Sequence, residues 1–223
     1  MTNRYNNYSD FLKNKYGVKV YKLPISIPVT CPNRDGTCGF DGCSFCGDIG
    51  AGYQHVPDTV GIKEQIAMHK GHIIDKYKAK KFIAYLQNYS NTYLPLATLE
   101  KYLLEACDED VVRIALATRP DCVSDSYLEK LADIKSKTKV DISVELGLQT
   151  VNYHALEEIR RGHSLAEYLD AMQRINKYGL ESCTHVILNL PGSDRLDVIE
   201  TAKVLSAMKT TEAKIHALYI IKG

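Results

Sequence analysis

The segment Val140-Asp-Ile-Ser-Val-Glu-Leu-Gly-Leu-Gln149 is the most informative part of this sequence of 223 residues. Every second residue from Val140 to Leu148 is aliphatic, and the positions between them are Asp141, Ser143, Glu145, Gly147 and Gln149. Because successive side chains of a strand point to opposite faces, this strand has one apolar and one polar face. A doubly wound sheet buries both faces, and a closed barrel fills its interior with aliphatic side chains. We therefore expect a wide, incomplete barrel with a polar inner face, the alternative being a one-sided sheet whose polar face is solvated.

Further segments rich in apolar and β-branched residues predict strands at 18–28, 81–87, 111–118, 182–190 and 214–221. Helical patterns lie between the strands, at 60–78, 97–107, 124–134, 151–160, 165–178 and 196–208. Ser124 and Ser164 are in position to cap two of these helices, and Gly179 is in position to end one. Alternating strands and helices predict βαβ units and a parallel sheet. The expected fold class is α/β, with the architecture of an incomplete (β/α)6 TIM-like barrel.

Length and charge limit the class of protein. A chain of 223 residues forms one large domain or two small ones, and its net charge of +1 excludes polybasic, histone-like binding of nucleic acid. The sequence has no secretory signal at its N-terminus and no apolar run of about 18 residues, so we expect a cytoplasmic protein without a membrane partner. It contains no linker and stops directly after the last predicted strand. We therefore expect residues 1–223 to form a single domain that is truncated on its C-terminal side.

Four of the seven cysteines fall within sixteen residues, directly after the first predicted strand: Cys31, Cys38, Cys43 and Cys46. The carboxyl ends of parallel strands are where α/β proteins place their active sites. Cytoplasmic thiols stay reduced, so the cysteines indicate a metal or redox site rather than disulfides. The residues alone leave three interpretations open: a structural zinc held by four thiolates, an iron–sulfur cluster held by three with one iron free, and a dithiol redox pair at Cys43 and Cys46.

Five motifs occur in an order that is specific when they are taken together. They are Cys31-x11-Cys43-x2-Cys46, Thr118-Arg-Pro-Asp121, Glu145-Leu-Gly-Leu-Gln-Thr150, Arg160-Arg-Gly-His163 and His185-Val-Ile-Leu-Asn-Leu-Pro-Gly-Ser-Asp194. With this series the sequence, over about residues 17–223, resembles the radical SAM superfamily. It resembles in particular the branch that contains the elongator catalytic subunit and its YhcC-like bacterial relatives, in which the first gap between cysteines is longer than usual.

The resemblance implies that Cys31, Cys43 and Cys46 are ligands of a 4Fe–4S cluster, and that the amino and carboxylate groups of S-adenosylmethionine (SAM) chelate the open iron. Electron transfer from the cluster would then break a C–S bond of SAM. The released 5′-deoxyadenosyl radical would abstract hydrogen from a substrate that the resemblance does not identify. Cys38 lies outside the pattern and is expected to be a bystander. The implied protein is a radical SAM enzyme without an assigned catalytic residue.

The resemblance places SAM against the end of the fourth strand, where Glu145 and Gln149 lie on the polar face. The planar guanidinium of Arg161 suits the methionyl carboxylate of SAM. His185, on the polar side of the fifth strand, could contact SAM or substrate, and Gly192 would let the backbone approach adenine. The alternatives are structural: an internal hydrogen bond between Glu145 and Gln149, a surface ion pair for Arg161, a core position for His185 and a plain turn at Gly192.

The segment that follows the second strand departs from the superfamily pattern. The resemblance implies a Gly-Gly-Glu-like sequence there, which holds the SAM amino group, but this chain has Gln87-Asn-Tyr-Ser-Asn-Thr-Tyr93. Polar side chains are needed to replace the missing carboxylate. We expect that role to fall to Gln87, Asn91 or Thr92.

The partners implied by the resemblance are an electron donor such as flavodoxin or ferredoxin and a substrate that could be RNA. A tRNA-modifying enzyme is therefore an alternative, and the basic stretches 76–81 and 135–139 are compatible with it, although both could be ordinary solvated faces. The alternative from another class is a zinc-stabilised RNA- or protein-binding module, with four cysteines, or three and His55, around the metal.

Overall fold

A computed structural model describes residues 5–47 and 56–218 and contains one six-stranded sheet in the order β1-β2-β3-β4-β5-β6. All neighbouring strands are parallel: β1 (Val20–Ile25), β2 (Lys81–Leu86), β3 (Val111–Thr118), β4 (Asp141–Gln149), β5 (Glu181–Leu188) and β6 (Glu212–Ala217). Because β1 and β6 are the two edges of this sheet, the expected incomplete (β/α)6 barrel is confirmed.

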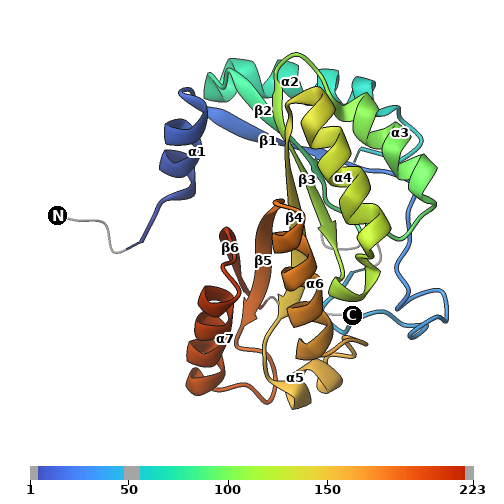
Figure 1. Cartoon of the computed structure of the whole chain (residues 1–223), viewed down its shortest axis with the longest axis vertical. Coiled ribbons are helices and arrows are strands. Elements are labelled where there is room, and N and C mark those ends of the chain that lie inside the picture. Colours follow the sequence, from blue (N-terminus) through green and yellow to red (C-terminus); the bar gives the residue numbers. More distant parts are fainter. Residues whose placement is uncertain (1–4, 48–55, 219–223) are drawn as a thin grey trace.

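Helices alternate with the strands along the chain (Figure 1). They are α1 (Tyr8–Tyr16), α2 (Ile62–Tyr77), α3 (Leu96–Ala106), α4 (Asp125–Thr138), α5 (Tyr153–Glu158), α6 (Leu165–Lys177) and α7 (Arg195–Ala207), with a 3₁₀ turn at Pro120–Cys122. Within the described ranges we find no helix with the length and apolar character needed to cross a membrane.

The outer face of the sheet carries the main hydrophobic core. In β4 the aliphatic residues Val144, Leu146 and Leu148 are completely buried against apolar residues of α2, α3, α4 and α6. Figure 1 shows these four helices together on one side of the sheet. Burying each such side chain contributes roughly 1.5–3 kcal/mol. The period-two pattern of β4 therefore fixes which face meets the helices and leaves its polar residues on the inner face.

Helix α1 covers the inner face at the amino ends of the strands. Its one fully buried residue, Leu12, packs with Ile83 and Tyr85 of β2 and Ala115 of β3. The N-cap of α1 is Asn7, whose side chain accepts a hydrogen bond from the backbone N–H of Ser9 at 2.9 Å. The sequence analysis missed this helix because a single buried position gives little apolar periodicity.

The remaining predicted elements are present with shifted ends. Helix α4 runs to Thr138, beyond the predicted end at residue 134, and β6 spans 212–217, while residues 219–221 of the predicted strand lie outside the described range. Ser164 forms the expected cap, since its backbone N–H donates to Glu167 at 2.7 Å in a capping box. Gly179 follows α6 with φ +63°, a left-handed conformation suited to glycine.

Candidate active site

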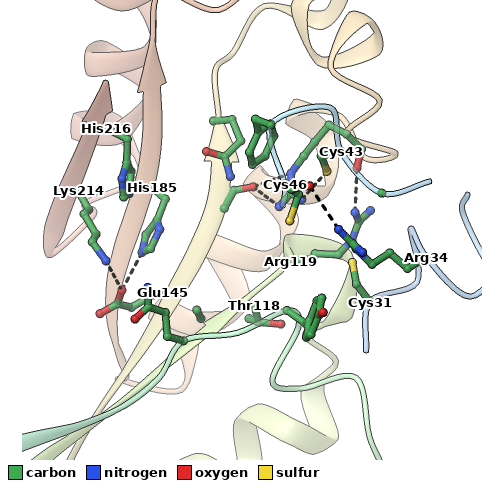
Figure 2. Close-up of a pocket in the computed structure, with 18 of the residues that line it drawn as sticks. Cys31, Arg34, Cys43, Cys46, Thr118, Arg119, Glu145, His185, Lys214 and His216 are labelled. Carbon is green, nitrogen blue, oxygen red and sulfur yellow. Dashed lines mark hydrogen bonds and ion pairs between the residues drawn. The ribbon is translucent and has the colours of Figure 1, made fainter. Parts of the chain in front are cut away.

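A cavity opens at the carboxyl ends of the strands, and chemically different groups line its two ends (Figure 2). Cys31, Cys43 and Cys46 lie at one end, which we call the thiol end. Glu145 and residues of β5 and β6 lie at the other end. Cys38 is exposed and does not line the cavity, so the four clustered cysteines divide into three and one.

Local hydrogen bonds fold the cysteine loop. The N–H of Arg34 donates to the carbonyl of Cys31 at 2.8 Å, and the N–H of Cys46 donates to the carbonyl of Cys43 at 2.9 Å. Gly36 has φ +92°, and a Cβ there would lie 2.6 Å from the ring of Phe40, so only glycine fits this turn. The loop therefore has a compact conformation that presents three thiols to the same cavity.

Two side-chain donors point at the sulfur of Cys43. Nη1 of Arg161 and Nδ2 of Asn33 each lie 3.4 Å from Sγ of Cys43. Such donors stabilise a thiolate and, around an iron–sulfur cluster, influence its reduction potential. Burial, followed by the neighbouring charge of Cys43, raises the pKa of the Cys46 thiol. Metal binding displaces such thiol protons, and the donor set therefore suits a metal cluster held through sulfur.

Arg161 also connects the cysteine loop to the end of β4. Its Nε and Nη2 donate to the carbonyl of Gly147 at 3.2 and 2.7 Å. A Cβ on Gly147 would lie 2.6 Å from Nη2 of Arg161 and 2.8 Å from Nε2 of Gln149, so glycine is required for this close approach. Gln149 itself has φ +77°, where the pairing of β4 with β5 shifts register. Strained backbone of this kind is frequent at functional sites.

The loops above the sheet are joined by a second arginine. Arg119, which follows β3, donates from Nε and Nη2 to Asp121 at 2.9 and 2.7 Å and from Nη1 to the carbonyl of Arg161 at 2.9 Å. Burial, followed by the charge of Arg161, lowers the pKa of His163 to about 4, so its imidazole is neutral near pH 7. The hydrogen bonds of Arg119 join the loop after β3 to the segment that follows α5, beside the thiol end.

Five side chains on the inner face form what we call the upper layer: Lys22, Glu145, His185, Lys214 and His216. The carboxylate of Glu145, only 1% exposed, accepts from Nζ of Lys22 and Nε2 of His185, both at 2.7 Å. Burial opposes its ionisation, but the hydrogen bond from His185 and the charge of Lys22 hold the pKa of Glu145 below its ordinary value. Glu145 is therefore ionised.

The upper layer does not suit a metal cation, although Glu145, Cys183 and His185 bring their ligand atoms within 4.8 Å of one another. Lys22 at 2.7 Å and Lys214 at 3.9 Å already neutralise the carboxylate. Burial, followed by the charge of Glu145, raises the pKa of Cys183, which remains a neutral thiol. A metal cation here would be repelled by two ammonium groups and would have one negatively charged ligand, the carboxylate of Glu145.

A second group of charges, the lower layer, lies at the amino ends of the strands: Lys15, Arg113, Asp141, Glu181 and Glu212. The Arg113 side chain is 1% exposed and forms ion pairs with Glu181 and Glu212. Lys15 and Tyr16 of α1 hydrogen-bond Asp141, with distances of 2.8 Å from Nζ and 2.7 Å from Oη. The lower layer therefore joins α1 to the strands.

The comparison with protein families agrees with this geometry. The model of the radical SAM superfamily matches residues 26–205. This chain belongs to the radical SAM superfamily. Membership implies a 4Fe–4S cluster and SAM as cofactors and makes the chain a radical SAM enzyme, while the substrate is not identified by it. The match leaves the zinc-stabilised binding module without support, and His55 lies outside the described residues.

Two curated proteins are similar over nearly the whole chain. YtqA of Bacillus subtilis (strain 168) is 37% identical over 221 residues, which are 99% of this chain and 68% of YtqA. YhcC of Escherichia coli (strain K12) is 34% identical over 219 residues, which are 98% of this chain and 69% of YhcC. Among solved structures, Elp3 of Methanocaldococcus infernus matches with a TM-score of 0.63 and 16% identity. That match covers 92% of this chain and 47% of the Elp3 chain, so this chain spans about half of it, and the likeness supports the fold alone.

The radical SAM chain brings most of the predicted site residues to one cavity. Its lining includes Cys31, Cys43, Cys46, Gln87, Glu145, Gln149, Arg161 and His185. The contacts differ from the structural alternatives considered above: Glu145 pairs with His185 and not with Gln149, and Arg161 is buried and bonds to the backbone of Gly147 instead of forming a surface ion pair. A side chain in this wall therefore both stabilises the barrel and faces the cavity.

Three predicted residues do not line the cavity of the radical SAM chain. Asn91 is fully buried, and its Nδ2 donates to the carbonyls of Leu86 at 3.0 Å and Ala117 at 2.8 Å, which joins the ends of β2 and β3. Oγ1 of Thr92 bonds to Oγ1 of Thr118 at 2.6 Å. The prediction that these side chains hold the SAM amino group has no geometric support, because backbone and neighbouring hydroxyl groups already use them.

Gly192 lies on the loop after β5 rather than in the cavity wall. Its φ is +70°, and a Cβ there would lie 3.1 Å from a carboxylate oxygen of Glu158. The turn thus requires glycine for its own conformation and its contact with α5. Of the residues proposed for the amino group and adenine, only Gln87 lines the cavity.

The sequence analysis missed several residues of the radical SAM site. Lys22, Lys214 and His216 occupy inner-face positions of the two edge strands, and their period-two spacing was the available signal. Asn33, which donates to Cys43, carried no signal, since a polar residue in a loop has many uses. The register of the sheet, which pairs His185 with Lys214, brings the upper layer together.

Proposed function

We propose that Cys31, Cys43 and Cys46 hold the 4Fe–4S cluster and that SAM binds beside them against Gln149 and Arg161. The observation that carries the proposal is the division of the cysteines, because three line one cavity and Cys38 is exposed outside it. Three cysteines leave one iron of a 4Fe–4S cluster without a protein ligand. When bound, the cluster supplies the electron for reductive cleavage of SAM.

The chain contributes orientation and shielding. Arg161 and Asn33 donate to Cys43, which stabilises that sulfur as an anion. A guanidinium has five N–H donors, and three contacts to Gly147 and Cys43 leave donors of Arg161 for the SAM carboxylate. Gln149 and Gln87 supply amide groups in the same wall. Helix α1 covers the inner face at the amino end, which limits water entry from that side.

The ligand assignment is tested by metal content. Cys43→Ala and Cys38→Ala are reconstituted with iron and sulfide without oxygen, and bound iron is measured beside the absorption spectrum. We expect Cys43→Ala to lose nearly all cluster, whereas Cys38→Ala, the matched control within the same loop, retains it. Equal loss in both variants, or a colourless protein that binds zinc, would overturn the assignment.

The SAM assignment is tested by product formation in the reduced, reconstituted protein. We expect 5′-deoxyadenosine from the unaltered chain and a strong loss in Arg161→Gln at unchanged iron content. A protein that carries a full cluster but neither binds nor cleaves SAM would overturn the proposal. An Arg161→Gln variant with full SAM cleavage would remove only the role of Arg161.

We further propose that residues 1–223 act as one radical SAM core and receive electrons from a flavodoxin or ferredoxin. None of the seven cysteines, all within the described ranges, forms a disulfide, which supports a reducing compartment such as the cytoplasm. RNA modification is the second candidate function, and the resemblance to the elongator catalytic subunit favours it. Titration with ferredoxin or flavodoxin, followed by assay of 5′-deoxyadenosine, tests the electron donor.

A further inference from the structure

The upper layer has an excess of positive charge, and all of its members except Lys22 line the cavity. Lys22 and Lys214 contribute two ammonium groups, and Glu145 contributes a single carboxylate. The carboxylates of Glu181 and Glu212, on the same two strands as His185 and Lys214, form ion pairs with Arg113 in the lower layer. The upper layer therefore lacks one negative charge, and a charge in a partly desolvated site is costly unless it is paired.

Two hydrogen-bonding groups of β6 are incompletely used. Nζ of Lys214 lies 3.0 Å from Oη of Tyr85 but 3.9 Å from Glu145, so within the described ranges an ammonium with three donors has one close acceptor. Nε2 of His216 is buried and has no hydrogen-bond partner among the described residues. Lys214 and His216 lie two positions apart on the same face of β6, and both line the cavity.

The surroundings of Lys214 favour an anionic oxygen over other ligands. Both ammonium groups lie over the Tyr85 ring, with Nζ of Lys22 at 4.4 Å and Nζ of Lys214 at 4.7 Å from the ring centroid, so these cations already use the ring. Burial, followed by the charges of His185 and Lys214, lowers the pKa of His216 to about 4, so its neutral ring can donate one N–H. An ammonium beside an imidazole N–H forms charge-assisted hydrogen bonds to carboxylate or phosphate oxygens.

The distribution of basic residues favours a small molecule over RNA. The stretches 76–81 and 135–139 precede β2 and β4, so they lie at the amino ends of those strands. The cavity lies at the carboxyl ends. Strand β4 itself has nine residues, which corresponds to roughly 30 Å at about 3.3 Å per residue. The two stretches therefore place no lysine beside the cavity, where it could bind an anionic group of the molecule that reacts there.

We propose that the substrate is a small organic molecule with an oxyanionic group, carboxylate or phosphate, which Lys214 and His216 bind at the end of the cavity opposite the thiols. The proposal rests on the proposed function for the chemistry at the thiol end. It assigns the upper layer to substrate rather than to SAM. The rest of such a molecule shares the cavity with the three cysteines.

Inorganic phosphate and acetate serve as probes for the two oxyanions. Each is titrated into the reconstituted protein labelled with [15N]histidine, and the imidazole signal of His216 is followed after assignment with His216→Gln. We expect a saturable shift with one or both anions. The one that binds more tightly distinguishes a phosphate ester from a carboxylic acid as substrate. Absence of any shift at millimolar concentrations of both anions would overturn the proposal.

Variants test whether anion binding depends on Lys214 itself or on positive charge anywhere on the protein surface. Lys214→Gln removes a charged donor, and we expect it to weaken anion binding roughly tenfold or more. Lys214→Arg should restore most of the affinity. Lys203→Gln is the matched control, since Lys203 is 68% exposed on α7 and pairs with Glu200, and it should bind the anions as the unaltered chain does. Undiminished binding by Lys214→Gln contradicts the proposal.

An oligoribonucleotide forms the third arm of the titration. Binding that is tighter than that of phosphate, is lost in Lys214→Gln and is not competed by phosphate would overturn the small-molecule substrate. Iron content and 5′-deoxyadenosine are measured on the same samples. If the unaltered chain shows no cluster or SAM cleavage but the His216 signal still responds to anion, the proposed function fails and the anion site stands.

Discussion

The two charged layers inside the half-barrel differ in how their charges are balanced. In the lower layer Arg113 lies between two carboxylates, and Lys15 of α1 pairs with Asp141, so acidic groups outnumber basic ones. In the upper layer Lys22 and Lys214 share the single carboxylate of Glu145. The first layer is covered by α1 and the second faces the cavity. The charges of the lower layer therefore stabilise the barrel, whereas positive charge in the upper layer remains available to a ligand.

The largest expected effect comes from breaking the lower layer. Arg113→Leu leaves Glu181 and Glu212 without their shared cation, and we expect the free energy of unfolding to fall by roughly 3–5 kcal/mol. Urea denaturation measures this loss of unfolding free energy. Lys203→Gln, which removes an exposed i,i+3 pair, is the control and should cost less than about 0.5 kcal/mol. A loss below about 1 kcal/mol in Arg113→Leu would mean that the lower layer is not structural.

A smaller effect is expected from Glu145→Gln, which keeps the side-chain volume but leaves two lysines without their carboxylate. We expect a loss of roughly 1–3 kcal/mol near pH 7. Because folding lowers the pKa of Glu145, its contribution is fully present above the ordinary value of 4.5 and is lost as the pH falls through the lower value of the folded state.

Measurements on Glu145→Gln at several pH values therefore distinguish the titration of Glu145 from that of His185. The difference in unfolding free energy between the unaltered chain and Glu145→Gln should be constant from about pH 8 to 5 and shrink below that, by about 1.4 kcal/mol per pH unit. Urea denaturation at each pH gives the values. A difference that already changes between about pH 8 and 6 would assign the effect to His185 instead of to Glu145.

The smallest effect is expected from Tyr85→Phe. The change removes the hydroxyl that accepts from Lys214 at 3.0 Å but keeps the ring that both ammonium groups contact. We expect a loss of about 1 kcal/mol or less in urea denaturation. A loss comparable with that of Arg113→Leu would show that the upper layer is as tightly coupled to the fold as the lower one.

The alternating pattern of β4 predicted the inner face correctly because the two-residue period of a strand is a property of the backbone. The same argument placed Glu145 and Gln149 in the cavity. It could not predict α1, which is stabilised by Leu12 and by ion pairs with strands that follow more than a hundred residues later. A short helix without its own apolar stripe depends on such tertiary contacts.

The polar loop after β2 shows the limit of prediction from residue type. Asn91 and Gln87 are both amides, but Asn91 satisfies backbone carbonyls at the ends of two strands while Gln87 lines the cavity. Buried backbone carbonyls need donors, and only the folded loop decides which side chain supplies them. Lys22 and Lys214 were missed for a related reason, since their meeting at Glu145 depends on the curvature of the whole sheet.

Glu145 has a mechanical consequence for the barrel. Lys22 lies on β1 and Lys214 on β6, which are the two edges of the sheet, and both ammonium groups approach the same carboxylate on β4. Backbone hydrogen bonds do not join these edges in the described residues, so the attraction to Glu145 draws them toward one another across the opening. The separation of the two edges is thus set in part by a single charge on a strand between them.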